Sequence, residues 1–564
     1  MPGLVDPARE DYSTRPMATR SGSLGIAIGL ALSAGGAAVA QTPVVIRAFD
    51  GTVPGARFGS VCDFAGDCDG DGVDDLVVGM DGDDRNGAFA GAVAVLSGRH
   101  GETLFEVLGA SGDRLGYAVA GIGDVNGDGR ADLVAGAPFD DRGGTDAGAV
   151  IVVSGATGAV LWSAFGAVPF EQLGMSVAHA GDLDGDTRPD VAAGAPFSNL
   201  ASELAGAVRA YSGTSGVLLR TWLGGVVGEN LGWSVAAVGD VDRDGRGDLA
   251  MGGIERLRFG AGVVRVVSGT SGLELRVVRG ASNEEFGHAI AGGPDWDQDG
   301  WPDMVVSTPA RNVSTPLNSA GGLVVVSGRD GSTLATIAGR TRFQRLGHAL
   351  ALPGDLDGDG RVEIAAGSSN GTLEIWSFVG PTRTFAQSGA GRFGSVLADG
   401  GDIDDDGRDD LIVTAPVVGA TQDGRIDVFA FTRKTLIGRP TWLRVASSGR
   451  QDWTVDAGVA NAGRAYLVIG SLSGIAPGTP LGSITLPLNL DFYSVASISG
   501  ANLLPFVNSL GALDGSGRAI GAFVTSPAVF GGLIGLTLDH ACLLLPGPGS
   551  FDFASNPVPM RIVP

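Results

Sequence analysis

One acidic segment recurs seven times in this chain, and it limits what the chain can fold into. Its clearest copy, GDVNGDGRADLVAGAP, places polar residues at every second position and then turns apolar. Counted from the first aspartate, the copies begin at Asp67, Asp124, Asp182, Asp240, Asp295, Asp355 and Asp402. The intervals are 57, 58, 58, 55, 60 and 47 residues. A near-fixed period of this length indicates one structural unit per copy.

Each copy carries the same flanking pattern. Phe-Gly or Leu-Gly stands about nine residues before the acidic segment, and Gly-Ala-Pro often follows it. Four short apolar runs, separated by turn residues, predict four strands per copy, and seven such copies predict a seven-bladed β-propeller. The last copy ends at residues 425–431 without a clear fourth strand. Residues 44–49 have the character and position of a fourth strand, so we expect them to complete the seventh blade and close the ring.

The acidic segments have the donor pattern of Ca²⁺ loops, because Ca²⁺ takes about six to eight oxygen ligands from carboxylates and carbonyls. Positions 1, 3, 5 and 9 carry acids, with Asn126 the one amide, and position 6 is glycine except at Thr187. Position 7 varies, as expected if only its carbonyl binds. The predicted ligands are Asp67, Asp69, Asp71, Val73, Asp75, Asp124, Asn126, Asp128, Arg130, Asp132, Asp182, Asp184, Asp186, Arg188, Asp190, Asp240, Asp242, Asp244, Arg246, Asp248, Asp295, Asp297, Asp299, Trp301, Asp303, Asp355, Asp357, Asp359, Arg361, Glu363, Asp402, Asp404, Asp406, Arg408 and Asp410.

Seven registered copies favour metal binding over seven metal-free acidic turns, since uncompensated carboxylates repel one another. Position 12 is apolar in every copy, which excludes an EF-hand and leaves position 9 to close the cage. Zn²⁺ prefers His or Cys ligands, and Cys68 at position 2 is expected to point outward. We therefore expect up to seven structural Ca²⁺ ions.

Phe-Gly, the DxDxDGxxD segment and Gly-Ala-Pro, repeated in register, resemble the FG-GAP repeats of integrin α-subunit propellers over residues 42–436. In that family, aromatic residues around one face form a cage for a partner's side chain. The residues after each Phe/Leu-Gly should ring one mouth of the central channel: Ser60, Tyr117, Met175, Trp233, His288, His348 and Ser395. Tyr117, Trp233, His288 and His348 are the candidate ligand-binding residues, and ordinary lining of the channel is the alternative.

The two ends of the chain differ from the repeats. Residues 24–40 are uncharged and end in Ala38-Val39-Ala40, so residues 1–40 are predicted to be a signal peptide, with Met17 an alternative start. No later stretch is long and apolar enough for a membrane helix. Residues 441–564 lack the acidic segment and predict a small all-β, sandwich-like domain of unknown function. This domain looks similar to C-terminal modules of secreted repeat proteins from planctomycete-like bacteria.

The composition and the absence of known catalytic motifs exclude several classes of function. A net charge of −24 argues against nucleic acid as a partner. No HExxH, GxSxG or P-loop motif is present, and no catalytic residue is predicted. Arg246-Gly247-Asp248 spells an integrin-ligand tripeptide, but Asp248 is position 9 of a loop. Cys62 and Cys68 lie close enough in sequence for a small disulfide, whereas Cys542 is expected to be a buried free thiol.

We therefore expect an all-β, non-enzymatic protein that is secreted or on the cell surface. It would be a calcium-binding propeller that acts as a binding or adhesion module for an extracellular protein or glycan. Two alternatives stay open: a carbohydrate-active protein, either a lectin or a polysaccharide lyase, and a purely structural envelope component.

Overall fold

The computed structural model describes residues 43–430 except 256–259, 314–316, 357–360, 379–381, 405–408 and 418–422, together with the strands and a few adjoining residues of 436–563. Every regular element in these ranges is a β-strand, which confirms the all-β prediction. Within the same ranges, no helix has the length and apolar character needed to cross a membrane. The predicted signal peptide, residues 1–40, lies outside the described residues.

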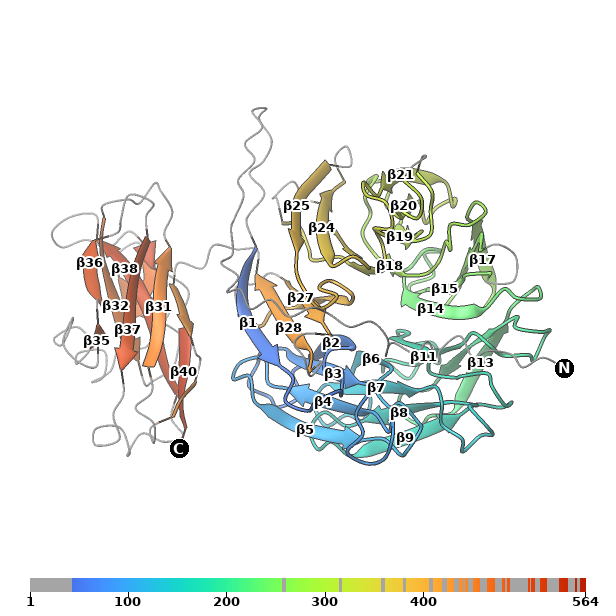
Figure 1. Cartoon of the computed structure of the whole chain (residues 1–564), viewed down its shortest axis with the longest axis horizontal. Coiled ribbons are helices and arrows are strands. Elements are labelled where there is room, and N and C mark those ends of the chain that lie inside the picture. The colour runs from blue at the N-terminus through green and yellow to red at the C-terminus, as the bar shows by residue number, and fades with distance from the viewer. Residues whose placement is uncertain are drawn as a thin grey trace, which may run out of the picture. The chain divides into compact units, whose positions relative to one another are not determined.

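Seven four-stranded antiparallel sheets lie around a ring and form a seven-bladed β-propeller, as predicted (Figure 1). Blades 1 to 3 contain β2 (Val61–Gly66), β3 (Asp75–Met80), β4 (Ala92–Leu96), β5 (Thr103–Leu108); β6 (Ala118–Gly123), β7 (Asp132–Ala137), β8 (Ala149–Val153), β9 (Val160–Phe165); and β10 (Ser176–His179), β11 (Val191–Ala195), β12 (Ala207–Tyr211), β13 (Leu218–Leu223). Blades 4 to 6 contain β14 (Leu231–Ala237), β15 (Leu249–Gly253), β16 (Val263–Val267), β17 (Glu274–Arg279); β18 (Ile290–Gly292), β19 (Met304–Ser307), β20 (Gly322–Val326), β21 (Thr333–Ala338); and β22 (Ala349–Ala351), β23 (Ile364–Ser368), β24 (Thr372–Ser377), β25 (Thr382–Ser388).

The seventh blade joins the two ends of the propeller. Its strands, in spatial order, are β1 (Val44–Asp50), β28 (Arg425–Ala430), β27 (Asp410–Ala415) and β26 (Leu397–Gly401). β1 pairs antiparallel with β28, with Phe49 opposite Ile426. Arg47 on β1 also donates from Nη2 to the carbonyl of Arg99 in blade 1, at 2.9 Å. The predicted closure by the N-terminal strand is therefore confirmed.

The Phe-Gly and Gly-Ala-Pro motifs meet where neighbouring blades touch. Gly136 belongs to Gly-Ala-Pro of blade 2, and a Cβ there would lie 2.0 Å from the carbonyl oxygen of Gly174 in blade 3. Gly174 itself has a φ of +91°, a conformation that favours glycine. The glycines of the two motifs thus allow adjacent blade backbones to approach closely, and buried residues of both blades pack on either side, among them Ile122 and Val191.

Position 2 of each acidic segment packs into the core between two blades. Cys68 is 1% exposed and its Sγ donates to the carbonyl oxygen of Ala131 at 3.3 Å, so the expectation that it points outward is wrong. The reason is visible in the sequence, because position 2 is apolar in the other copies: Val125, Leu183, Val241, Trp296, Leu356 and Ile403. Cys62 packs in a different core cluster, and both thiols are free, so they form no disulfide.

Beyond the propeller, the described strands form separate β-sheets. One sheet has the order β29 (Leu436–Arg439), β31 (Arg450–Asp456), β37 (Arg518–Val524) and β35 (Phe506–Val507). The other contains β30 (Trp442–Arg444), β40 (Val558–Val563), β38 (Thr537–Leu545), β32 (Ala465–Ser471), β36 (Leu510–Ala512) and β39 (Phe553–Ala554), and β33 (Thr479–Leu481) pairs with β34 (Ile484–Leu486). Cys542 lies on β38, but its side chain is outside the described residues. The domain boundaries and the sandwich packing stay predictions.

Candidate functional site

Each acidic segment joins the first strand of a blade to the second; we call these segments metal loops 1 to 7. Metal loop 4 follows β14 and precedes β15, for example. In an antiparallel four-stranded blade, the turns between strands 1 and 2 and between strands 3 and 4 lie at one edge. The loops that enter strand 1, and the turns between strands 2 and 3, lie at the other edge. The propeller therefore has a metal-loop face and an opposite face.

The position-9 carboxylate is buried in every metal loop and is bound by backbone N–H groups. In metal loop 4, Asp248 Oδ2 accepts from the N–H of Val241 at 2.7 Å and of Asp242 at 3.2 Å, and Oδ1 accepts from Gly269 at 2.9 Å. Gly269 lies in the turn between strands 3 and 4 of the same blade, so this side chain ties two turns together. The position-9 residues are 0–1% exposed: Asp75, Asp132, Asp190, Asp248, Asp303, Glu363 and Asp410.

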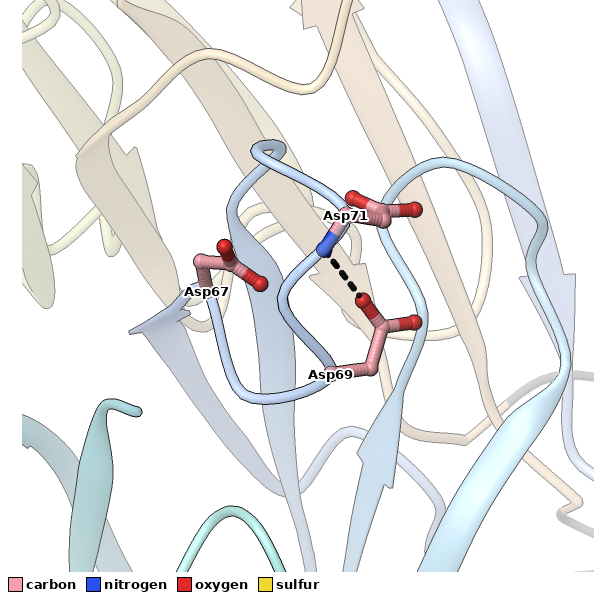
Figure 2. A group of neighbouring side chains, drawn as sticks. All are labelled: Asp67, Asp69 and Asp71. Atoms are coloured by element: carbon pink, nitrogen blue, oxygen red, sulfur yellow. Dashed lines mark hydrogen bonds between the residues drawn. The ribbon is translucent and has the colours of Figure 1, made fainter. Parts of the chain in front are cut away.

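In several of the described metal loops, carboxylates of the acidic positions gather around the turn. Figure 2 shows Asp67, Asp69 and Asp71 of metal loop 1, where the backbone N–H of Asp71 donates to Asp69 Oδ1 at 3.0 Å. Among the described residues, oxygen atoms of three acids lie within 4.8 Å of one another in five loops. These trios are Asp67, Asp69 and Asp71; Asp182, Asp184 and Asp190; Asp240, Asp242 and Asp248; Asp295, Asp297 and Asp299; and Asp402, Asp404 and Asp410.

Other predicted ligands differ from this pattern or lie outside the described residues. In metal loop 2 the amide of Asn126 donates to Asp128 Oδ2 at 3.0 Å, so one of its donors is turned toward a carboxylate. Thr187 in metal loop 3 takes the glycine position with a φ of +72°. Residues 357–360 of metal loop 6 and 405–408 of metal loop 7, with the predicted ligands Asp357, Asp359, Asp406 and Arg408, lie outside the described residues.

Burial makes the position-9 carboxylates costly to ionise. It raises the pKa of Asp75 to about 7, and the like charges of Asp69 and Asp71 add to the effect. Burial also raises the pKa of Asp190 and Asp248 to about 6, although backbone N–H groups oppose the shift. A bound cation would offset both desolvation and repulsion. The donors are all oxygen atoms, so the site suits a hard divalent cation rather than Zn²⁺.

Position 7 does more than offer a carbonyl, which the sequence analysis missed. Arg188 of metal loop 3 donates from Nη1 to the carbonyl oxygen of Asp124 in metal loop 2 at 3.4 Å and lies 3.7 Å from Asp124 Oδ1. Arg246 reaches Asp182 of the preceding loop in the same way, at 3.3 Å. The signal was available, because position 7 is arginine in five copies: Arg130, Arg188, Arg246, Arg361 and Arg408.

Metal loops 4 and 5 use a different link. The guanidinium of Arg243 lies 3.4 Å from the ring centroid of Trp301, which takes position 7 of metal loop 5. In metal loop 1, by contrast, Gly70 occupies the place of Arg243, and a Cβ there would lie 1.0 Å from Nη1 of Arg130. Glycine at position 4 therefore makes room for the arginine of the next loop.

The predicted channel-mouth residues lie on the opposite face, and all seven are half-buried. Three of them form a continuous row from blades 4 to 6: the ring centroids of Trp233 and His288 are 6.1 Å apart, and those of His288 and His348 are 5.4 Å apart. Tyr117 is not in this row and packs edge-on against Phe139 at 6.4 Å. Burial lowers the pKa of His348, and the nearby Arg345 and Arg392 lower it further, so this imidazole is neutral at pH 7.

The Arg246-Gly247-Asp248 tripeptide is not displayed as a ligand. Asp248 is 1% exposed and both of its carboxylate oxygens accept backbone hydrogen bonds. A partner could not reach this carboxylate without unfolding the turn.

Comparison with known proteins agrees with this architecture. A family model described as the FG-GAP repeat matches residues 115–153 and 173–217. The chain is 32% identical to Integrin alpha-V of Gallus gallus over 203 residues, which is 33% of the chain and 19% of that protein. It is 26% identical to Integrin alpha ina-1 of Caenorhabditis elegans over 226 residues (37% and 16%) and 35% identical to Integrin alpha-7 of Mus musculus over 179 residues (29% and 14%).

The matched segments thus cover less than a fifth of each of these relatives. The similarity to these relatives is consistent with the repeats in the sequence, with the contacts between the Phe/Leu-Gly and Gly-Ala-Pro motifs of neighbouring blades, and with the seven four-stranded sheets. The chain is an integrin-α-like FG-GAP repeat protein with a seven-bladed β-propeller.

Proposed function

We propose that this protein is an exported, calcium-stabilised propeller that acts as a binding or adhesion module for an extracellular protein or glycan. The observation that carries the proposal is the division between its two faces. Acidic loops with a hard-cation donor set occupy one face, and the row of Trp233, His288 and His348 lies on the other. Partly exposed aromatic groups at a concave mouth are a common means of binding a ligand. The similarity to integrin α-subunits supports an extracellular role.

Calcium has a structural part in this proposal. Up to seven ions would sit among positions 1, 3, 5 and 9 and the position-7 carbonyls of the metal loops. When bound, Ca²⁺ supplies positive charge to carboxylates that otherwise repel one another. The chain's own contribution is to hold position 9 in place through the backbone N–H groups described above. No catalytic residue is assigned, because seven like sites on seven turns are typical of structural metal ions.

A binding screen with and without EDTA tests both parts. Purified protein would be screened against glycans and extracellular proteins, with Trp233→Ala as the test variant. Phe165→Ala, which removes an exposed aromatic ring from the outer strand β9, is the matched control. We expect ligand binding to be lost in Trp233→Ala and kept in the control, and the melting temperature to fall in EDTA.

Each alternative predicts a different outcome. A melting temperature that EDTA leaves unchanged would contradict the calcium assignment. A fall in melting temperature without any ligand in either condition would favour a purely structural envelope component. Cleavage of a bound glycan would favour a polysaccharide lyase, and glycan binding without cleavage a lectin.

A further inference from the structure

Blade 6 differs from the other blades on the face opposite the metal loops. The turn between its second and third strands, β23 and β24, has only three residues, 369–371. The corresponding turn of blade 2, between β7 and β8, has eleven residues, 138–148. This short turn is where the unusual 47-residue interval between the last two acidic segments arises.

The longer turns of other blades cover the loop that enters the next blade. In blades 1 to 5, each makes a β-bridge to the Phe/Leu of the next Phe/Leu-Gly motif, as Gly206 does to Leu231. Among the described residues, blades 6 and 7 have no such bridge, and only in blade 6 is the turn itself cut to three residues. The residue before the motif also differs in exposure. Arg392, beside Phe393, is exposed, whereas its counterparts in the other blades are buried, as Asn230 is, or half-buried, as Arg114 is.

We call the surface formed by residues 339–348, 369–371 and 389–395 the blade-6 notch. Its three segments are in contact. Ser369 donates from Oγ to the carbonyl oxygen of Gln344 at 3.4 Å, and the N–H of Gly389 donates to the carbonyl oxygen of Gly371 at 3.0 Å.

The blade-6 notch is basic in a chain whose net charge is −24. Residues 339–348 hold Arg340, Arg342 and Arg345 and no acid, and Arg392 lies in the next segment. Glu285 Oε2 lies 2.8 Å from Arg345 Nη2. The three segments of the notch carry four arginines and no acid of their own, which favours a negatively charged partner.

The blade-6 notch also displays an apolar ring on a strained backbone. Phe343 is 56% exposed and has a φ of +58°, in the left-handed region that disfavours bulky residues. Gly112 and Gly228 occupy the equivalent position before blades 2 and 4, so the turn itself needs no aromatic residue. An exposed phenylalanine with positive φ also stands at Phe170, so Phe343 is distinguished by the arginine-rich segment around it.

We propose that the blade-6 notch binds an acidic polypeptide segment that carries an apolar side chain. Arg342 and Arg392 pair with its carboxylates, because a guanidinium matches a carboxylate with two parallel N–H donors. Phe343 contacts the apolar side chain. A polypeptide is favoured over an acidic glycan because the guanidinium of Arg342 lies 4.5 Å from the centroid of the Phe343 ring and covers one of its two faces. A sugar stacks on a ring face, whereas an apolar side chain can also pack against the ring edge.

This inference rests on the proposed binding role of the propeller, but not on the aromatic row at the channel mouth. The test uses the full chain in Ca²⁺ and a short fluorescent peptide of aspartate and glutamate with two central leucines. One control peptide has serine in place of leucine, and another has lysine in place of the acids. A polygalacturonate oligosaccharide is the glycan probe. Affinity is measured by fluorescence anisotropy.

Arg342→Glu and Arg392→Glu should each weaken peptide binding at least about tenfold, and added salt should weaken binding to the native chain. Phe343→Gly should weaken binding without lowering the melting temperature, because glycine relieves the backbone strain. Phe170→Gly is the matched control: Phe170 is 55% exposed with a φ of +63°, in a loop without arginine. It should leave peptide affinity unchanged.

Four results would overturn the inference. Two concern the variants: unchanged peptide affinity in both charge reversals, or an equal loss of affinity in Phe343→Gly and Phe170→Gly. The third is tighter binding of the oligosaccharide than of the peptide, and the fourth is a change of oligomeric state in Arg342→Glu, which would make the partner a second copy of the chain. Failure here is distinguishable from failure of the proposed function. A ligand that is lost in Trp233→Ala but kept in the notch variants would preserve the binding role while excluding the blade-6 notch.

Discussion

Asp248→Ala removes a buried carboxylate that we assign two roles, as a metal ligand and as a tie between two turns. Its removal leaves the N–H groups of Val241 and Gly269 buried without an acceptor. Each unsatisfied buried donor costs about 1–3 kcal/mol, so the two together cost about 2–6 kcal/mol. The third donor, Asp242, is exposed and can turn to water.

The pH dependence of this loss separates hydrogen bonding from charge. In EDTA, burial holds the pKa of Asp248 at about 6, above an unfolded value of about 3.9. The folded native chain therefore binds more protons than the unfolded chain between these values, and it loses up to about 3 kcal/mol as the pH rises through the window. The variant lacks this group, so its deficit in EDTA should be larger near pH 4.5 than near pH 7, by about 2 kcal/mol.

Urea denaturation in EDTA and in excess Ca²⁺ provides the measurement, and Asp244→Asn is the matched control. Asp244 is an exposed position-5 residue whose Oδ1 accepts from the N–H of Arg246 at 3.0 Å, a bond that the asparagine oxygen can keep. The control should match the native chain within about 0.5 kcal/mol in EDTA. It should lose a share of the Ca²⁺ stabilisation, which is about 2.7 kcal/mol per site at a hundredfold excess over Kd.

Two results would refute this reasoning. If Asp248→Ala behaves like the native chain in EDTA at both pH values, position 9 does not tie the turns together. If Asp244→Asn keeps the whole Ca²⁺ gain, metal loop 4 does not use position 5 as a ligand.

Three further predictions concern links between blades. Deleting residues 43–50 should uncover the edge of β28 and cause aggregation, which light scattering would measure. A truncated protein that stays monodisperse would refute closure of the ring by β1. Arg188→Ala should speed backbone amide exchange in metal loop 2 but not in metal loop 4, and equal rates in the native chain and the variant would contradict the link. Burial raises the pKa of Asp63 to about 7, and the charge of Asp399 adds to the shift. In excess Ca²⁺, the free energy of unfolding should therefore fall between about pH 4 and pH 7, and Asp63→Asn should flatten this slope. An unchanged slope in the variant would count against the shift.

The repeat made the ring readable from the sequence. Seven registered segments required seven like units, and the missing fourth strand of the last unit identified the strand that closes the ring. The inward direction of position 2 was also readable, because an apolar residue stands there in every copy. Cys68 alone does not indicate a direction, because a thiol can serve as a metal ligand or as a core residue, but its six apolar counterparts do.

Other features depend on contacts between repeats, which one repeat does not encode. The link from Arg188 to Asp124 joins residues of different copies, so position 7 looks merely variable when the copies are read one at a time. The 47-residue interval between the last two acidic segments indicates that this repeat is shorter than the others, but it does not say which turn of blade 6 is shortened. Only the strand bounds place it at residues 369–371, beside Arg392.

The two faces of the propeller are under different constraints, and this bears on where recognition can evolve. On the metal-loop face, the acidic positions recur in register, and Arg130, Arg188 and Arg246 at position 7 each reach the preceding loop, so a change in one loop disturbs its neighbour. On the opposite face, the turn between strands 2 and 3 varies from three residues in blade 6 to fourteen in blade 5 without breaking the ring. Loops that tolerate such variation can take on binding residues at little cost to the fold. Specificity for a partner is therefore expected in the irregular blade 6, and not in the regular repeats that reveal the fold.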